Sequence, residues 1–416
     1  MLGATDIINV ASGVQAVNAA NASVSYAISS TFDPVAGSTL SVTPSTQFAA
    51  VGAKRGYSAN ELSMSGHLDA GFAANMTPAM ARVYGRLAGQ DDAHVQSSMD
   101  ALGNEAVQSV GAARMAASQD FVDRMNSCPQ FGPGGMQLAE QNCLWSRATD
   151  NHAHRDGSST GVGYETGANK YQIGGQRGVG DGWFLGGSIG YDQSSLSAPL
   201  TTVSGTGWTA ALIAKKQIGD WLFSGAVDVS TGSYDSRRQV TLNDAPETVS
   251  ASFNASGIGL HARVAHQFAM DGGWYFKPYV DVHAVRLHTG AYNETGANEL
   301  NLLVNSSNGT ALTVSPMLEA GSLFDLGHGM ELRGYVSGGV SVSNQNDWSA
   351  NATLQGSVAR AGKFTTASEL PNQRFKLNVG ADLIANKNLD IRLEYTGEFA
   401  SGFRSNGAML KAAFAF

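Results

Sequence analysis

Long hydrophobic runs are missing from this sequence. No stretch approaches the roughly 18 consecutive apolar residues of a membrane-spanning helix, although 43% of the 416 residues are hydrophobic, so a helical membrane protein is excluded. Proline is scarce at 10 residues, whereas glycine is abundant at 50, and Trp, Tyr and Phe number 6, 12 and 17. This composition favours a β-rich chain, in which side chains fit a curved sheet and rings lie at interfaces.

Charge is sparse as well. Charged residues make up 14% of the chain, and the formal net charge of -8 argues against nucleic acid as a partner. No segment resembles a nucleotide-binding loop. We therefore expect no cofactor and no nucleic-acid partner.

Cysteine is limited to two residues, Cys128 and Cys143, at the ends of a Pro/Gly-rich stretch (CPQFGPGGMQLAEQNC). In a protein that faces the periplasm, such a pair most simply closes a loop as a disulfide. The alternative is two free thiols. Metal binding is disfavoured because no other ligand stands beside either cysteine.

The last ten residues, GAMLKAAFAF, alternate in polarity and then stop. One face of this predicted strand is apolar and the other carries Lys411, so one face is suited to lipid and one to water. A strand that ends on an aromatic residue, with nothing after it, has to be paired inside a closed sheet. We interpret it as the last strand of an outer-membrane barrel, with the apolar face formed by Ala408, Leu410, Ala412, Phe414 and Phe416.

The start of the sequence, MLGATDIINVASG, lacks the basic segment and apolar segment of a secretory signal peptide. An outer-membrane protein needs such a peptide to leave the cytoplasm. We therefore expect this chain to be the C-terminal part of a longer precursor, or its first residue to be misassigned.

From about Cys143 onward, twelve alternating segments separated by turn signals predict twelve antiparallel strands, an even number, as single-chain bacterial barrels require. Alternation alone does not exclude a soluble sandwich. However, short turns (GVGDG, GD, AMDGG, LGHG, NKN) alternate with predicted long loops at Ser236–Val249, Thr289–Gly309 and Asn344–Asn372. Trp183, Trp221 and Trp274 each follow a short turn, as an aromatic girdle at one membrane interface would.

The part before the barrel divides in two. Residues 1–57 read as short strands, too few for a domain with its own core. Residues 58–127 change to a helical pattern: Ser58 with Glu61 forms a capping box, and Thr77 precedes a proline at a first helical position. The last predicted helix, about residues 104–126, would be about 33 Å long. Its charged residues exclude a lipid-facing span but suit the interior of a polar pore.

These pieces in this order resemble the translocator domain of autotransporters, the type V secretion proteins. The resemblance covers about residues 60–416 and rests on a helical linker, a first strand near CLWSRAT, the segment YQIGGQRGVGDGWFLGGSIGY (Tyr171–Tyr191) and a final Phe. It implies a monomeric twelve-stranded barrel at residues 128–416 in the outer membrane of a Gram-negative bacterium, with strands from about 143. It also implies a linker helix in the pore and an N-terminal passenger outside the cell, and residues 1–57 resemble the last coils of a β-solenoid passenger stem.

The resemblance also implies partners: outer-membrane lipid, the barrel assembly machinery, periplasmic chaperones and the chain's own passenger. The terminal strand resembles the signal that the assembly machinery reads. In this signal Phe416 is the final aromatic, and Phe414 stands where a Tyr is frequent. A helix that runs down the pore would reach Cys143 through a periplasmic loop, and a disulfide would then tether the helix to the barrel.

Charges of both signs are predicted on the inward faces of the strands, where they would solvate the lumen and pack against the helix, or where a specific pair would gate it. They are Lys170, Asp192, Asp228, Arg263, Lys277, Asp281, Glu319, Glu331, Arg333, Lys376, Asp382, Arg392, Glu394 and Glu398.

Other readings of the sequence point to different functions. His152 and His154 share a strand face but lack a third ligand at a suitable spacing, so no metal site is predicted. No catalytic residue is predicted either, since the loops hold no convincing acid, base and nucleophile set. The alternatives to a translocator are an open porin-like channel and, less favoured, a barrel-borne hydrolase.

Overall fold

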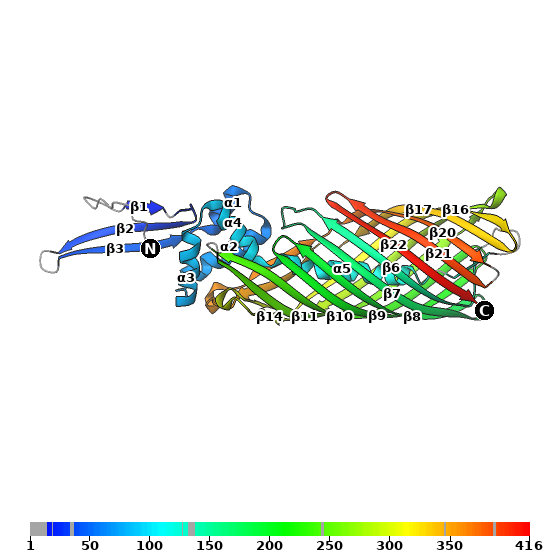
Figure 1. Ribbon diagram of the computed structural model, residues 1–416. Coiled ribbons are helices and arrows are strands. Elements are labelled where there is room, and N and C mark those ends of the chain that lie inside the picture. Colours follow the sequence, from blue (N-terminus) through cyan, green and yellow to red (C-terminus); the bar gives the residue numbers. More distant parts are fainter. Residues whose placement is uncertain are drawn as a thin grey trace.

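The computed structural model describes residues 15–18, 20–33, 37–126, 128–131, 138–242, 245–344, 347–385 and 388–416. Within them, twelve long antiparallel strands form a closed barrel, which confirms the predicted fold class (Figure 1). In chain order they are β6 (Cys143–Arg155), β7 (Tyr164–Gly180), β8 (Trp183–Ala198), β9 (Thr201–Ile218), β10 (Trp221–Leu242), β11 (Ala245–His266), β13 (Trp274–Thr289), β16 (Ser307–Gly327), β17 (Met330–Ser343), β20 (Gln373–Ala385), β21 (Leu389–Ala400) and β22 (Phe403–Ala415).

The last strand closes the barrel against the first. β22 pairs with β6 over its full length, from Phe403 opposite Arg155 to Ala415 opposite Cys143. Leu410 and Phe414 face outward and are 56% and 52% exposed, whereas Lys411 between them points inward and is 1% exposed. The alternation in the sequence therefore corresponds to a lipid-facing side and a lumen-facing side.

The two rims of the barrel differ. Trp183, Trp221 and Trp274 begin β8, β10 and β13 at the rim of the short turns, where their side chains are exposed. At the opposite rim, two long connections fold into a small antiparallel sheet. It consists of β14 (Tyr292–Asn293), β15 (Leu302–Val304), β18 (Asp347–Leu354) and β19 (Phe364–Glu369), with the short helices η3 (Asn298–Leu300) and η4 (Ala359–Ala361) between them.

The predicted loop at Ser236–Val249 is wrong. β10 and β11 continue as a paired ladder through these residues, up to Leu242 opposite Ala245. Val240 and Val249 are almost fully buried here because they pack in the same apolar core as the helices outside the barrel. The polar residues that suggested a loop occupy the opposite face of a hairpin that extends beyond the barrel.

Four helices cover the mouth at this rim: α1 (Phe48–Arg55), α2 (Ala59–Ala73), α3 (Pro78–Ala88) and α4 (Asp92–Gly103) (Figure 1). We call them the cap. The predicted capping box at Ser58 is present, and Thr77 accepts a hydrogen bond from the Met80 amide. The cap is attached to the loop sheet, since the Asn60 side chain donates to the Ala367 carbonyl at 2.7 Å and accepts from the Ala367 amide at 2.8 Å.

The helical part begins earlier than the predicted boundary at residue 58. The first helix, α1, starts at Phe48, and its N-cap residue makes no side-chain capping hydrogen bond. Instead, the Asp69 carboxylate of α2 accepts from the amides of Phe48 and Ala49, both at 2.9 Å. Because this cap comes from another helix, local sequence signals do not reveal it.

The helix predicted at about 104–126 is also shorter than expected. Asn104 has a left-handed conformation, with φ 47°, and separates α4 from a 3₁₀ turn, η1 (Glu105–Gln108). The α-helix α5 (Ser109–Asp123) follows and lies inside the barrel (Figure 1). Its 15 residues span about 22 Å rather than 33 Å, so it fills part of the barrel's length.

The strands before the cap differ from the solenoid coils suggested for residues 1–57. β1 (Gln15–Asn18), β2 (Val24–Asp33) and β3 (Gly37–Thr46) pair as an antiparallel meander that extends away from the cap. A β-helix would pair its strands in parallel. Asn21 joins this sheet to the cap, because its side-chain amide donates to the Leu87 and Gln90 carbonyls.

Three smaller features complete the described chain. β4 (Pro129–Phe131) and β5 (Leu138–Glu140) form a hairpin between α5 and the barrel, and β12 (Phe268–Ala269) with η2 (Asp271–Gly273) precedes β13. No helix in the described ranges is both long and apolar enough to cross a membrane.

Candidate functional site

The lumen helix α5 is surrounded by the barrel wall. Ten of its residues are buried, and they include both apolar and charged side chains. Val110, Ala112, Met115 and Val122 are each at most 5% exposed. Small residues on the remaining positions let the helix fit within the narrow barrel, and its polar groups require partners on the wall.

Ion pairs connect α5 to several separate strands. The guanidinium of Arg114 contacts the Asp192 carboxylate of β8 at 2.8 Å, and Arg124 contacts Glu394 of β21 at 3.1 Å. In a third pair the cation is on the wall and the carboxylate on the helix: Lys170 of β7 contacts Asp120 at 3.3 Å. β7 and β8 are neighbours in the barrel, and β6 and β22 separate β7 from β21, so the pairs hold the helix to two sections of the wall.

Hydrogen bonds add further links between the helix and the wall. Ser118 donates to Asp228 of β10 at 2.8 Å, and Gln119 donates to Thr313 of β16 at 3.0 Å. Arg147 of β6 donates to the Phe121 carbonyl at 3.1 Å, near the C-terminal end of the helix, where backbone carbonyls lack intrahelical partners.

An apolar contact anchors the other half of the helix. The Trp348 ring of β18 lies between Gly111 of α5 and Gly309 of β16, and a Cβ at either glycine would overlap it. Trp348 belongs to a buried cluster that includes Met115 of the helix and Leu287 of the wall. The lumen helix therefore packs against the sheet built by the extracellular loops as well as against the barrel.

A cavity of about 300 Å³ remains beside the helix, lined by acidic and basic side chains of both the helix and the wall. Such a surface attracts water and small ions of either sign. The cavity extends from Leu196 and Val203 near the loop rim to Asp220 and Trp221 at the rim of the short turns, so water-accessible space remains along α5.

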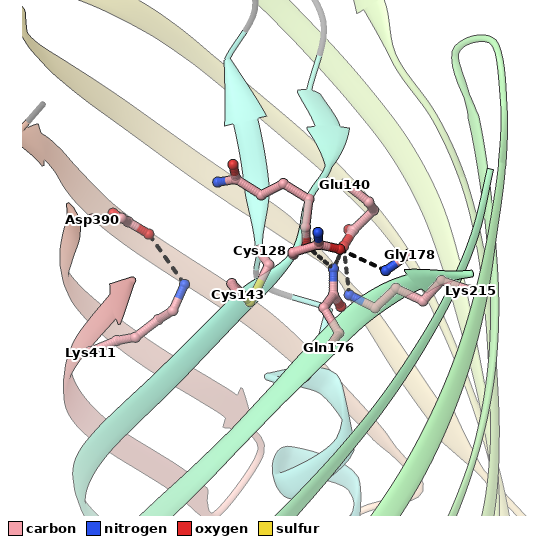
Figure 2. The surroundings of a disulfide bond; sticks show 10 residues. Cys128, Glu140, Cys143, Gln176, Gly178, Lys215, Asp390 and Lys411 are labelled. Carbon is pink, nitrogen blue, oxygen red and sulfur yellow. Dashed lines mark hydrogen bonds and ion pairs between the residues drawn. A yellow bond between two sulfur atoms is a disulfide. The ribbon is translucent and has the colours of Figure 1, made fainter. Parts of the chain in front are cut away.

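A disulfide joins Cys128 to Cys143, with 6.3 Å between the Cα atoms, and connects the segment after α5 to the first barrel strand (Figure 2). Glu140, at the end of the β4–β5 hairpin, contacts Lys215 at 2.9 Å, and both side chains are buried. The side chain of Asn142 accepts from the Gly178 amide at 2.7 Å. The hairpin is thus fixed covalently at one point and by polar contacts to β7 and β9.

The wall carries its own charge network. Arg333 and Arg392 both contact Asp382, which is fully buried, and Lys277 contacts Glu319 at 3.0 Å. Most residues predicted to face the lumen form ion pairs with the helix segment or with each other, and Asp228 accepts from Ser118 and pairs with His261 instead. The residues in such ion pairs are Lys170, Asp192, Arg263, Lys277, Asp281, Glu319, Arg333, Lys376, Asp382, Arg392, Glu394 and Glu398. Glu331 lies at the rim of the short turns instead, opposite Asp325 in the ladder.

The sequence analysis did not predict several basic side chains that face the lumen. Arg147, Lys215 and Arg374 are all less than 8% exposed and have acceptors in the lumen. The period-two pattern assigns each of them to the inward face, as it does for Lys411, which is 1% exposed and contacts Asp390.

The two histidines of the first strand lie near its far end. His152 is beside Asp150 at 3.1 Å, and His154 contacts Asp156 at 2.9 Å and Glu165 at 3.3 Å. The side chain of His152 is 72% exposed. These are solvated contacts at the loop rim, and the carboxylates around them were not foreseen from spacing along the strand.

The cap contains a cluster of three carboxylates, Glu61, Asp100 and Glu105. Burial, followed by the charges of Glu61 and Glu105, raises the pKa of Asp100 to about 7. Burial also raises the pKa of Glu105 to about 7, although the Val162 amide donates to its carboxylate and opposes the shift. Both acids therefore hold protons in the folded cap at pH values where they would be ionised in an unfolded chain.

We expect the stability of the cap to fall as the pH rises from about 4 to about 7. In this window the folded cap binds more protons than the unfolded chain, so stability declines, and it levels off above the folded pKa. Thermal melting of the helical circular dichroism signal at several pH values measures the trend. Asp100→Asn should make the melting temperature less dependent on pH. Asp271→Asn, at an exposed turn, should leave the pH dependence unchanged. A melting temperature that rises over this window would contradict the expectation.

Comparison with known proteins identifies relatives of this architecture. The family described as Autotransporter beta-domain matches residues 144–396. The translocator domain of the autotransporter NalP from Neisseria meningitidis is 14% identical, with a TM-score of 0.59 over 75% of this chain and 99% of that chain. The beta domain of the Bordetella autotransporter BrkA is 18% identical, with a TM-score of 0.50 over 67% of this chain and 100% of that chain. At these identities the two structures show a shared fold. No curated protein matches the chain.

Proposed function

The chain belongs to the autotransporter β-domain family as an outer-membrane translocator unit, and we propose that α5, the hairpin and the cap hold its pore closed after export. The family places the barrel in the outer membrane of a Gram-negative bacterium, with an attached passenger domain. The observation that carries the proposal is the set of contacts from α5 to β7, β8 and β21.

The closure has three parts in this proposal. Residues 58–127 act as the linker, in which α5 fills the lumen and α2, α3 and α4 cover the outer mouth. The barrel unit, residues 128–416, begins with a hairpin that is tied to the wall by the Cys128–Cys143 disulfide. Residues 1–57 lead outward to the passenger through β1, β2, β3 and α1, and the meander supports this direction because it extends away from the barrel (Figure 1).

Export itself would follow from the same topology. Folding of the barrel around an inward-running α5 would bring the preceding chain to the cell surface as a hairpin. The free energy that drives export would come from folding of the barrel and of the passenger. The terminal strand, with Phe414 and Phe416 on its exposed side, would be read by the barrel assembly machinery after delivery by periplasmic chaperones.

We further propose that the unit works as a monomer, binds no nucleic acid and carries no catalytic activity of its own. Family membership indicates a transport barrel rather than a known enzyme. The hydrolase alternative has no support in the loop residues, and the open-porin alternative is less favoured because α5 occupies the lumen.

Single-channel conductance in a planar bilayer tests the closure. The full chain should conduct less current than a chain without the helix, because α5 occupies much of the lumen and leaves a cavity of about 300 Å³ beside it. A chain that begins at residue 143, with Cys143→Ser to avoid a free thiol, should conduct several times more current. The matched control is the full chain with Cys128→Ser and Cys143→Ser, which keeps the helix. Equal and large conductance in all three chains would reject the closure and favour an open porin.

A further inference from the structure

A second cluster of titratable groups lies where the C-terminal turn of α5 meets β13. Asp123 of the helix and Asp281 and His283 of the strand each offer one ligand atom, and these atoms lie within 4.8 Å of one another. Asp281 and His283 are 3% and 1% exposed. The cluster thus bridges the lumen helix and the wall, and Asp123 and Asp281 line the lumen cavity, through which an ion can reach it.

His283 has an unusual hydrogen-bonding state. Its Nδ1 atom is 2.7 Å from Nδ1 of His261, whose Nε2 atom is 2.6 Å from the Asp228 carboxylate. A carboxylate accepts, so His261 donates through Nε2, and a neutral His261 then accepts at Nδ1 from His283. His283 Nε2 then carries a lone pair. It is buried without a hydrogen-bond partner among the described residues and lies 3.6 Å from the Asp123 carboxylate.

The lone pair of His283 Nε2 and the negatively charged Asp123 carboxylate therefore face each other. This arrangement is unfavourable unless a cation lies between them. The nearest cationic side chains, Arg263 and Lys376, contact the carboxylates of the cluster but not the imidazole of His283. Arg263 donates to Asp281 at 2.8 Å and to Asp123 at 3.2 Å, and Lys376 is 3.9 Å from Asp123. Neither reaches His283 Nε2 with a hydrogen bond, because that atom has none.

Charged groups of both signs face the cluster. Each carboxylate oxygen keeps a second lone pair beside its arginine bond, so it can still bind a cation. The charged groups are Asp123 on α5, Asp228 on β10, Arg263 on β11, Asp281 on β13, Arg374 and Lys376 on β20, and Glu398 on β21.

We propose that Asp123, Asp281 and His283 bind one divalent transition-metal ion of the zinc class. One imidazole nitrogen and two carboxylate oxygens form a common zinc donor set, and a water molecule can fill the fourth position. His261 and Asp228 act as the outer shell that orients His283, as metal-bound histidines generally require. Gly259 makes room for this pair, since a Cβ there would overlap both side chains.

The site gives the closure a further link between helix and wall. This consequence rests on the proposed function, whereas metal binding itself does not. A bound ion would join α5 to β13 at the end of the helix opposite Trp348, where Phe121 and Val122 already pack in a second apolar cluster with Trp145 of the wall.

Isothermal titration calorimetry with a zinc salt tests the site on the full chain in detergent, stripped with a chelator and with its disulfide intact. We expect one zinc ion per chain, and at least tenfold weaker binding in Asp123→Asn and in His283→Gln. Asp123→Asn lies on the helix and leaves the barrel wall unchanged, so it remains informative if His283→Gln misfolds. The double variant His152→Gln and His154→Gln, at the exposed rim, should bind like the parent.

Absence of zinc binding near neutral pH would overturn the site. Binding that survives both cluster variants, or that is lost only with the rim histidines, would overturn it as well. The conductance measurement is separate. A chain that binds zinc through these residues yet conducts as an open pore would retain the metal site and reject the closure.

Discussion

Replacing Trp348 with alanine is expected to weaken the packing of α5 by about 3 to 5 kcal/mol, the usual cost of deleting a large buried aromatic side chain. The ring is 6% exposed and lies between Gly111 and Gly309, which leave no other side chain to fill the space. The cavity left behind would border the N-terminal half of α5. The helix should therefore open more often, although the barrel ladder is not touched.

Hydrogen exchange of the α5 amides measures this effect, and brief current steps in bilayer recordings report the same openings. Trp208→Ala is the matched control, because that ring is 55% exposed on the outer face of the barrel. It removes a tryptophan without altering the lumen. Unchanged protection of α5 in Trp348→Ala would show that the remaining polar and apolar contacts hold the helix without this ring.

Replacing Arg238 with alanine is expected to release the cap from the mouth. Arg238 contacts the Glu294 carboxylate, and each residue of this pair is about 1% exposed at the side chain. The guanidinium also donates to the Ala101 carbonyl of α4 and to the Leu300 carbonyl at 3.3 Å. Removing one partner of a buried pair typically costs about 3 to 5 kcal/mol, because the remaining charge loses its compensation.

Limited proteolysis of the cap measures this release. The double variant Arg238→Met with Glu294→Gln removes both charges and should recover much of the loss, since no ion is left buried alone. As Gln, residue 294 would keep one acceptor oxygen, which can accept from either the Asn104 side chain or the Leu302 amide. Equal cleavage of the single and double variants would contradict the argument and assign the loss to packing.

Much of the barrel could be predicted from the sequence because one local rule governs it. Alternation places Lys411 inside and Phe414 outside, and it specifies the face of Asp382 or Glu394 without knowledge of any partner. The sequence did not reveal which charges meet. The pair Arg114 and Asp192 depends on the depth and rotation of α5, which tertiary contacts set.

The errors have the same origin. α1 was missed because its cap, Asp69, comes from a neighbouring helix, and the length of α5 was overestimated because Asn104 turns the chain in the left-handed conformation. The β10–β11 extension was read as a loop because the cap that buries Val240 and Val249 is distant in sequence. Each case needs knowledge of the packed partner, which periodicity does not supply.

The position of the disulfide bears on the order in which the molecule assembles. Cys143 is paired in the ladder with Ala415, from the other end of the barrel sequence, but it is bonded to Cys128, only 15 residues away. Closing a short loop costs less chain entropy than bringing distant strands together. We therefore expect the Cys128–Cys143 disulfide to form before β22 pairs with β6. The barrel would then close around a helix that is already linked to its first strand.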